Sequence, residues 1–159
     1  MTYDEWEKQV PTAITNDTLW RVQVYRLALF LADIAWYDVC KLAKVPQMVS
    51  LSDQLYRSVG SISANIGEGY SRASGKDQAR FYEYALGSAR EARGWYFKGR
   101  HVLGAKVAEH RINFLARIIQ LLLRMIPDTR GKYIREESAL YSPQPLEELL
   151  HNITFSEDE

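Results

Sequence analysis

The chain has 159 residues, of which 47% are hydrophobic and 25% charged, with 20 basic and 20 acidic side chains. This length buries one hydrophobic core and is short for two domains. The longest apolar run, 27–32, is far shorter than the ~20 residues of a membrane-spanning helix. The acidic start also lacks the basic end and apolar stretch of a signal peptide. We therefore expect one cytoplasmic domain with no membrane partner.

The zero net charge conceals a strong segregation of charge along the chain. Residues 1–17 carry one lysine and four acids, whereas 136–159 carry seven acids and no base. Between them, 18–135 carry nineteen basic and nine acidic side chains, a net charge of +10. We expect an acidic N-terminal extension (1–17), a helical bundle (18–127) and an acidic, partly mobile C-terminal tail (128–159).

The spacing of apolar residues predicts four helices in chain order. The first spans roughly 19–44 and ends before Pro46, because the residue that precedes a proline avoids helical dihedral angles. The second begins near Ser50 or Ser52, whose hydroxyl groups can cap free backbone donors, and ends around Gly69.

The third helix begins after Ser74, since Ser74 and Asp77 have capping-box spacing, and it ends near Gly104. The fourth spans about 107–126 and stops at Pro127. The short connections favour antiparallel neighbours, and the period-two pattern of strands is absent from the sequence. The sequence therefore predicts an all-α fold, an up-down-up-down antiparallel four-helix bundle. The lone Cys40 cannot form an internal disulfide, and its apolar neighbours predict a buried, unreactive thiol.

Three segments, 51–57, 61–69 and 87–91, carry a family resemblance in the same order and with compatible spacing. They read Leu-Ser-Asp-Gln-Leu-Tyr-Arg, Ser-Ile-Ser-Ala-Asn-Ile-Gly-Glu-Gly and Gly-Ser-Ala-Arg-Glu. The pattern resembles the four-helix-bundle family encoded in 23S rRNA intervening sequences, to which the accessory protein of diversity-generating retroelements is also similar. The resemblance covers roughly Leu19 to Ile126. It implies a ring-shaped homopentamer without a catalytic group, with nucleic acid or a reverse transcriptase as partner.

Apolar residues cover more of the first and fourth helices than one core requires. On the fourth, the apolar arc spans about 220° and is interrupted mainly by Arg111, whereas a core-facing arc needs about half of that. Since a four-helix bundle has no central helix, this surplus predicts association with other copies of the chain. The remaining polar stripe of the fourth helix consists of His110, Asn113, Arg117, Gln120 and Arg124.

The residues of the family pattern have a catalytic and a structural interpretation. Antiparallel pairing of the second and third helices places Ser61 beside Tyr84 and Glu91 near Arg57. A carboxylate at the edge of an apolar face needs a cationic partner, so we expect an Arg57–Glu91 pair. We interpret the set as a structural motif and not as a catalytic site. Its members are Arg57, Ser61, Asn65, Glu68, Ser88 and Glu91.

The metal and cofactor motifs are incomplete. A di-iron bundle uses two Glu-x-x-His pairs, and only Glu148 with His151 has this spacing. Gly67-x-Gly69 lacks the third glycine of a dinucleotide fingerprint and follows a helix where that fold has a strand. With one cysteine, zinc would need only histidine and carboxylate ligands. We expect no metal, no cofactor and no enzymatic activity, with a carboxylate-based enzyme as the weaker alternative.

The basic body provides the functional prediction. A charged stretch is usually only a solvated helix face, but several copies of a +10 body would attract phosphates in a salt-dependent way. We predict a non-enzymatic oligomer that binds RNA or DNA through the backbone with little sequence specificity. The alternative is a protein-interaction scaffold, such as an accessory subunit of a reverse transcriptase. The predicted phosphate contacts are Arg90, Arg93, Arg100, Arg117 and Arg124, and the predicted stacking surfaces are Tyr70, Tyr82, Trp95 and Tyr96.

The acidic tail has two candidate roles, solubility and inhibition. Leu146, Leu149 and Leu150 predict one short amphipathic turn that docks on the body, while the rest of 136–159 is expected to be mobile. A tethered polyanion competes with phosphate at high effective concentration, so the tail is a candidate brake on nucleic-acid binding.

Overall fold

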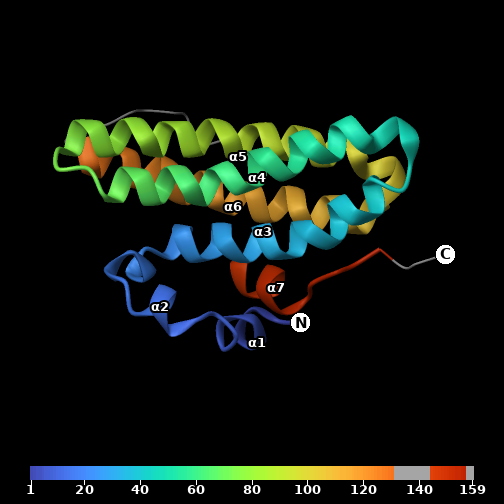
Figure 1. Ribbon diagram of the computed structural model, residues 1–159, viewed down its shortest axis with the longest axis horizontal. Helices are drawn as coiled ribbons and strands as arrows, with labels where there is room; N and C mark the ends of the chain where they lie inside the picture. The colour runs from blue at the N-terminus through green and yellow to red at the C-terminus, as the bar shows by residue number, and fades with distance from the viewer. Residues whose placement is uncertain (131–143, 157–159) are drawn as a thin grey trace.

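Four long helices and several short elements account for the described chain, which in this computed structural model comprises residues 1–130 and 144–156 (Figure 1). These residues are all-helical and contain no strand, as the sequence predicts. The long helices are α3 (Gln23–Leu42), α4 (Val49–Tyr70), α5 (Gly75–Leu103) and α6 (Ala105–Arg130). The short elements are α1 (Tyr3–Glu7), α2 (Thr12–Thr15), the 3₁₀ turns η1 (Thr18–Arg21) and η2 (Pro46–Met48), and α7 (Leu146–His151).

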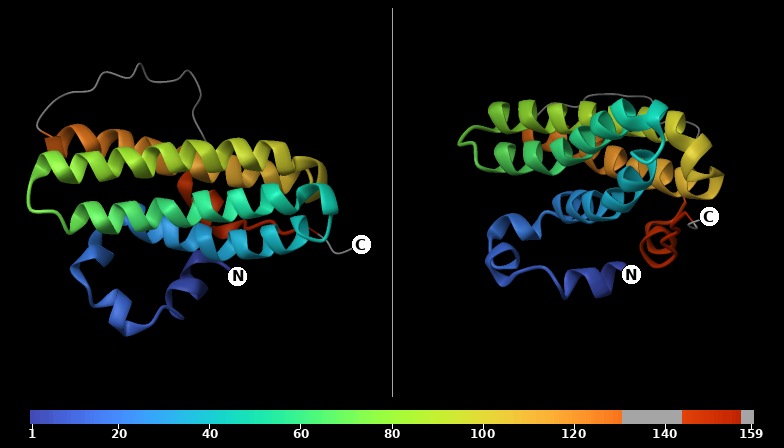
Figure 2. Two further views of the ribbon diagram at one scale, coloured as in Figure 1. Left: turned by 45° about the horizontal axis from the view of Figure 1, so that its top comes forward. Right: turned by 45° about the vertical axis from the view of Figure 1, so that its right-hand side comes forward.

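The long helices lie side by side, and each runs antiparallel to the next along the chain (Figures 1 and 2). α5 packs along both α4 and α6, while α3 packs mainly on α4 and touches α5 and α6 less. Side chains such as Leu31, Ile62 and Leu115 are fully buried between these helices. Each buried side chain of this size stabilises the fold by about 1.5–3 kcal/mol.

The predicted ends of α5 are confirmed. The Ser74 hydroxyl accepts a hydrogen bond from the backbone N–H of Asp77 at 3.2 Å, which satisfies one free donor of the first turn. At the other end, Gly104 has φ +89°, a left-handed conformation that glycine adopts without steric cost. The chain therefore reverses there and enters α6 directly.

Two predicted helix ends are wrong. Leu19 lies in the short turn η1, so the first long helix begins at Gln23. Pro127 does not stop α6, which continues to Arg130. Tertiary contacts hold this last turn in place, because Ile126 is buried and the Arg130 guanidinium pairs with Glu83 of α5 at 2.7 Å. A proline inside a helix is unfavourable but tolerated when the surrounding packing compensates.

Both terminal segments pack on the α3 side of the molecule, away from α4 and α5 (Figures 1 and 2). The acidic N-terminal extension buries Trp6, whose ring lies 5.1 Å from the ring of Phe30 in α3. The predicted amphipathic turn of the tail is confirmed as α7, with Leu149 buried. α7 therefore covers part of the apolar surplus of α6. The predicted mobility of the tail concerns mostly 131–143 and 157–159, which lie outside the described residues.

The outer face of α3 corrects a further expectation. Cys40 is exposed instead of buried, and Trp36 and Tyr37, on the same side of the helix, are 54% and 55% exposed. The apolar pattern around Cys40 was misleading, because this face of α3 points away from the core. Part of the predicted apolar surplus of the first helix thus lies at the surface.

Candidate nucleic-acid interface

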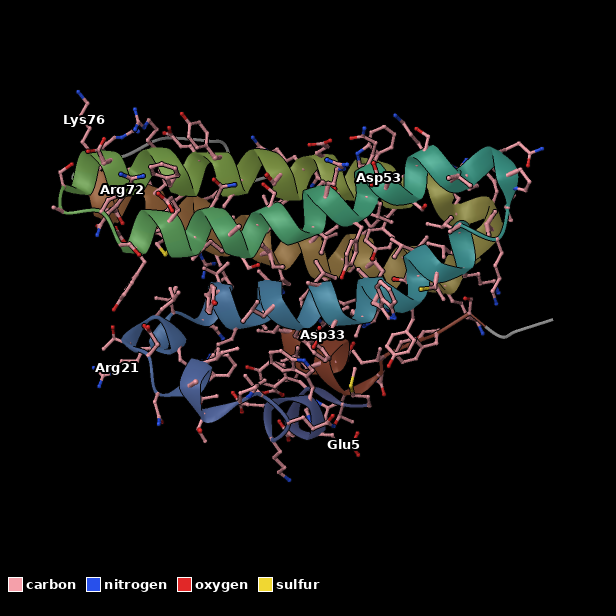
Figure 3. All side chains as sticks on the ribbon, in the orientation of Figure 1. Glu5, Arg21, Asp33, Asp53, Arg72 and Lys76 are labelled. Carbon is pink, nitrogen blue, oxygen red and sulfur yellow. The ribbon has the colours of Figure 1, made fainter. Side chains whose placement is uncertain are left out.

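The positive excess of the described chain lies on α5 and α6, which are packed neighbours. α5 carries six lysine and arginine side chains against three acids, and α6 carries five against two. Residues 1–21, on the α3 side, carry four acids and two bases. In Figure 3, the labelled residues on the α3 side are Glu5, Arg21 and Asp33, whereas those on the side of α4 and α5 are Asp53, Arg72 and Lys76. The segregation of charge along the sequence is therefore also a segregation in space.

The three predicted arginines of α5 lie within three helical turns. Arg90 is exposed, while Arg93 and Arg100 are half-buried and seven residues apart, which places both on the same side of the helix. The Arg100 guanidinium lies 4.0 Å from the centroid of the Phe97 ring, and its Nη1 donates to the Phe97 carbonyl at 2.6 Å. This arginine is consequently held in one orientation.

The two predicted arginines of α6 have different environments. Arg124 is exposed. Arg117 is half-buried, and its Nε donates to the carbonyl oxygen of Gln144 at 3.0 Å, while Nη1 donates to Gln120 Oε1 at 3.1 Å. Arg117 thus binds the C-terminal segment just before α7, and only part of its hydrogen-bonding capacity is left for a phosphate.

The structure brings three of the six predicted motif residues together. Ser88 donates to the Ser61 hydroxyl across α4 and α5 at 3.1 Å, and Asn65 Nδ2 donates to the Ser61 carbonyl and hydroxyl at 2.8 and 2.9 Å. Ser61 therefore pairs one helical turn further along α5 than predicted, since Tyr84 was its expected neighbour. These mutually satisfied side chains link the two helices.

The predicted Arg57–Glu91 pair is wrong, because each of the two side chains has a partner on its own helix. Arg57 instead pairs with Asp53, one turn away on α4, at 3.0 Å, and Glu91 accepts a hydrogen bond from Trp95 Nε1 at 3.2 Å. Both Arg57 and Glu91 are exposed. Glu68 likewise forms a local ion pair, with Arg72.

The predicted stacking surfaces are only partly available. Tyr82 and Tyr96 are buried, whereas Trp95 is half-buried and Tyr70 is 36% exposed. Aromatic residues at helical spacing are more often part of a core than of a surface, and this holds for two of the four.

A buried polar cluster centred on Arg111 was missed. Arg111 is fully buried, with Nε 2.7 Å from Asp38 Oδ2 and Nη2 3.1 Å from Oδ1, so the ion pair joins α6 to α3 in a bidentate arrangement. The Tyr96 hydroxyl also donates to Asp38 Oδ2 at 2.9 Å. Burial raises the pKa of Tyr96 well above its ordinary value, and the neighbouring Asp38 carboxylate raises it further. A charged residue on the apolar side of each helix was the signal that pointed to this pair.

The same cluster holds the C-terminal segment. Arg111 Nη2 donates to the carbonyl of Thr154 at 2.9 Å, and His110 Nε2 lies 2.8 Å from the carbonyl of Leu149. His110 Nδ1 lies 2.9 Å from Arg111 Nη1, which can only donate, so a neutral imidazole with its proton on Nε2 satisfies both contacts. Burial, and secondarily the charge of Arg111, lowers the pKa of His110 from 6.5 to about 4.

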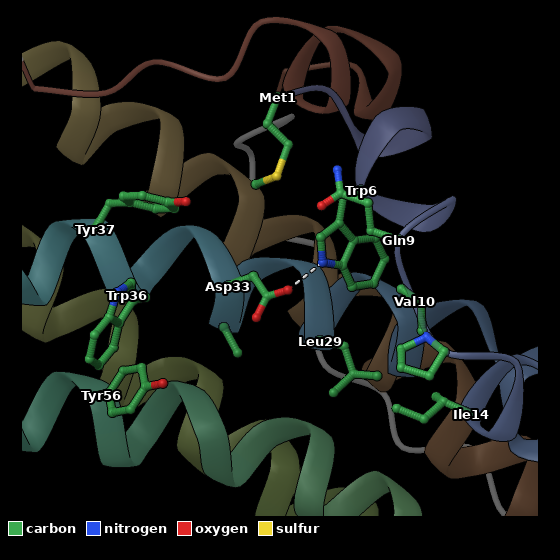
Figure 4. Close-up of a pocket in the computed structure, with 12 residues that line it drawn as sticks. Met1, Trp6, Gln9, Val10, Ile14, Leu29, Asp33, Trp36, Tyr37 and Tyr56 are labelled. Atoms are coloured by element: carbon green, nitrogen blue, oxygen red, sulfur yellow. Dashed lines mark hydrogen bonds between the residues drawn. The ribbon is translucent and has the colours of Figure 1, made fainter.

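An open groove of about 570 Å³ lies between the N-terminal extension and α3 (Figure 4). Its wall includes the exposed side chains of Trp36 and Tyr37 and, from α4, Tyr56, which is 42% exposed. Asp33 accepts a hydrogen bond from Trp6 Nε1 beside it. The groove is therefore aromatic with an acidic group, unlike the basic α5 and α6 pair.

Within 1–130 and 144–156, no group of three or more histidine, cysteine, aspartate or glutamate side chains is arranged to hold a metal ion. None of the described helices is long and apolar enough to cross a membrane.

Comparison with known proteins identifies the family. The model of the 23S rRNA-intervening sequence protein family matches residues 21–126, two thirds of the chain. The chain belongs to this family. The match begins just before α3 and ends near the end of α6, so it covers the four long helices of this 23S rRNA-intervening sequence family member and leaves the terminal segments outside.

A solved structure is similar to this family member. It is the crystal structure of a protein with unknown function from the S23 ribosomal protein family from Bacteroides thetaiotaomicron VPI-5482, with a TM-score of 0.61 and 26% sequence identity. The similarity covers 65% of this chain and 97% of that chain. The search of curated proteins finds no match.

Proposed function

We propose that this family member is a cytoplasmic, non-enzymatic four-helix bundle that assembles into a ring-shaped homopentamer and binds RNA or DNA. Binding occurs through the sugar-phosphate backbone, with little sequence specificity. The observation that carries the proposal is the concentration of ten exposed or half-buried basic side chains against five acids on the packed pair α5 and α6, apart from Arg111, which is buried against Asp38.

The basic side chains are spread along the helices, and this arrangement favours a chain of phosphates over a single small anion. Arg93 and Arg100 are about 10 Å apart along the axis of α5, from the 1.5 Å rise per residue. Arg90 and Arg124 add exposed cations on the same helix pair. Cations spread over this distance suit a polyanion that contacts several of them at once, and repetition around a ring would multiply the effect.

The names of the matched family and of the similar structure point in the same direction. One refers to an insertion in 23S ribosomal RNA and the other to a ribosomal protein family. The first name refers to ribosomal RNA and the second to the ribosome, and both support nucleic acid as the partner.

The surface of α3 supports self-association. Trp36, Tyr37 and Tyr56 remain largely exposed around the groove, and aromatic side chains in such number usually mark a contact surface. The groove lies on the opposite side of the molecule from α5, so association through it would leave the basic helices accessible to nucleic acid.

The hydrogen bonds among Ser61, Asn65 and Ser88 support a structural role for the family pattern and a protein without enzymatic activity. These polar groups satisfy one another between two helices. No activated nucleophile or general base is needed to explain their positions.

The test combines mass and binding. Light scattering should give a mass several times 18.4 kDa, with fivefold expected. The double variant Arg93→Ala/Arg100→Ala should weaken binding to unrelated sequences equally and lower the slope of log K against log salt by about two. Arg57→Ala is the matched control, because Arg57 is an exposed arginine on α4 that pairs locally with Asp53. A monomer, or an equal loss in the control, would contradict the proposal.

The second candidate function is a protein-interaction scaffold, such as an accessory subunit of a reverse transcriptase. The aromatic groove with its Asp33 carboxylate favours it, because such a surface accepts a protein segment better than a phosphate backbone. If the groove binds a partner protein and not a second copy of the chain, Trp36→Ala/Tyr56→Ala should abolish partner capture while leaving the mass in light scattering unchanged.

A further inference from the structure

Phe97 of α5 is exposed to an unusual degree. Its side chain is 56% exposed, more than that of any other large hydrophobic residue in the described part of the chain. Unlike tyrosine or tryptophan, phenylalanine has no polar group to hydrogen-bond with water, so an exposed ring gains nothing from solvent. Such a ring on a long surface helix indicates a contact surface for a binding partner.

The surroundings of Phe97 are cationic. Arg93 lies four residues before it and Arg100 three residues after it, and these spacings place all three side chains on neighbouring positions of one side of α5. Arg90, seven residues before Phe97, lies on the same side. The partner of this ring therefore has to be compatible with three nearby positive charges.

One face of the Phe97 ring is in contact with a cation. The Arg100 guanidinium lies 4.0 Å from the ring centroid, and its Nη1 donates to the Phe97 carbonyl at 2.6 Å. The guanidinium thus covers one face of the ring, and the exposed fraction leaves the rest of the ring accessible.

We propose that Phe97 is a stacking platform for an unpaired base, so that the partner of this surface is single-stranded nucleic acid. The base would stack on the ring face opposite Arg100, with Arg90 and Arg93 near the adjoining phosphates. In a duplex both faces of an internal base are already stacked, so this contact distinguishes single strands from duplexes. The inference rests on the proposed nucleic-acid binding and adds the class of strand and the residue that selects it.

Phe81, near the start of the same helix, shows why Phe97 is the better platform. Two guanidinium groups lie near the Phe81 ring, those of Arg72 at 4.6 Å and Arg80 at 5.5 Å from its centroid. The Tyr84 ring lies nearly perpendicular to it, with the two ring centroids 5.5 Å apart. Phe81 is half-buried as a result. Side chains of the same chain thus surround the Phe81 ring, whereas the Phe97 ring is covered on one face only.

The experiment uses Phe97→Leu, which keeps an apolar side chain and a good helix former but removes the aromatic face. The matched control is Tyr84→Leu, which removes a 51% exposed ring from a different side of α5. Full-length proteins are titrated with a 20-nucleotide single-stranded RNA and with a 20-base-pair RNA duplex at two salt concentrations. We expect Phe97→Leu to weaken single-strand binding roughly tenfold or more, with duplex binding and the salt dependence unchanged. The control should match the wild type on both probes.

Other outcomes overturn the inference in distinguishable ways. Unchanged single-strand affinity in Phe97→Leu refutes the platform while leaving nucleic-acid binding intact. An equal loss on both probes shows that the ring does not select single strands. A smaller mass of the variant in light scattering shows that Phe97 lies between subunits instead. If the wild type binds neither probe, the proposed function and this inference fail together.

Discussion

Replacing Arg111 by methionine should destabilise the protein severely. The side chain of Arg111 is fully buried and makes two hydrogen bonds to Asp38, which is only 1% exposed. Methionine fills much of the same volume but leaves the Asp38 carboxylate buried without a cation. Breaking a buried ion pair in this way typically costs about 3–5 kcal/mol, a large part of the roughly 5–15 kcal/mol that stabilises a domain.

The double variant Asp38→Leu/Arg111→Met tests the cause of this loss. Because neither charge remains buried alone, its stability should recover to within about 1–3 kcal/mol of the wild type. The residual cost comes from the Tyr96 hydroxyl, which loses its acceptor, and from the Thr154 carbonyl and His110 Nδ1, which lose their donor. Adding Tyr96→Phe removes that hydroxyl and should recover part of the remainder.

Urea unfolding followed by circular dichroism measures the free energies, at a fixed protein concentration because unfolding of an oligomer depends on it. A loss below about 1 kcal/mol in Arg111→Met would refute the argument, as would a double variant whose loss equals the sum of the two single losses.

Three further predictions concern pH, surface pairs and the tail. The pKa of His110 is about 4 in the folded protein and 6.5 in the unfolded chain, so the unfolded state binds more protons between these values and stability is lost as pH falls from 6.5 toward 4. The unfolding free energy is measured with urea at pH 4 and pH 7. The loss between pH 7 and pH 4 should be roughly 3 kcal/mol smaller in His110→Gln than in the wild type. Arg57→Ala and Glu91→Ala should each change the unfolding free energy by less than about 1 kcal/mol, because both side chains are exposed. A loss of several kcal/mol would instead support the buried Arg57–Glu91 pair that the sequence suggested. Replacing the seven acids of 136–159 by their amides keeps Leu149 in place and should tighten nucleic-acid binding at low salt, with a gain that shrinks as salt rises; equal affinities would rule out the brake.

The helical architecture was predictable because its signals are local. Ser74 with Asp77 marks the start of α5, and Gly104 marks its end, since capping and a left-handed turn each depend on one or two residues. Pro127 misled the prediction because its effect depends on the packing of Ile126 and on the Arg130–Glu83 pair, which are set by tertiary structure.

The candidate sites were harder to predict because they depend on helix register. An error of one turn between α4 and α5 suggested Tyr84 as the neighbour of Ser61, while the actual contact joins Ser61 to Ser88. Arg57 and Glu91 do not pair, because each has a partner one turn away on its own helix. In the sequence, Arg111 is only an interruption of an apolar arc. Its partner Asp38 lies 73 positions away, so only the folded chain brings the two charges together.

Which apolar surfaces stay exposed depends on the terminal segments that pack on the long helices. α7 and the N-terminal extension lie outside the matched family segment, and both pack on the α3 side, so the apolar surplus of the long helices is partly covered within the chain. The groove that Trp36 of α3 lines includes an uncovered part of it.

Nucleic-acid binding by the full-length protein is the central claim, and a salt titration tests it most directly. Two unrelated RNA sequences of equal length are each titrated at several salt concentrations by fluorescence anisotropy. Binding through the α5 and α6 arginines predicts equal affinities for both sequences and a steep linear fall of log K with log salt. No binding at low salt, or an affinity that does not change with salt, would contradict the account.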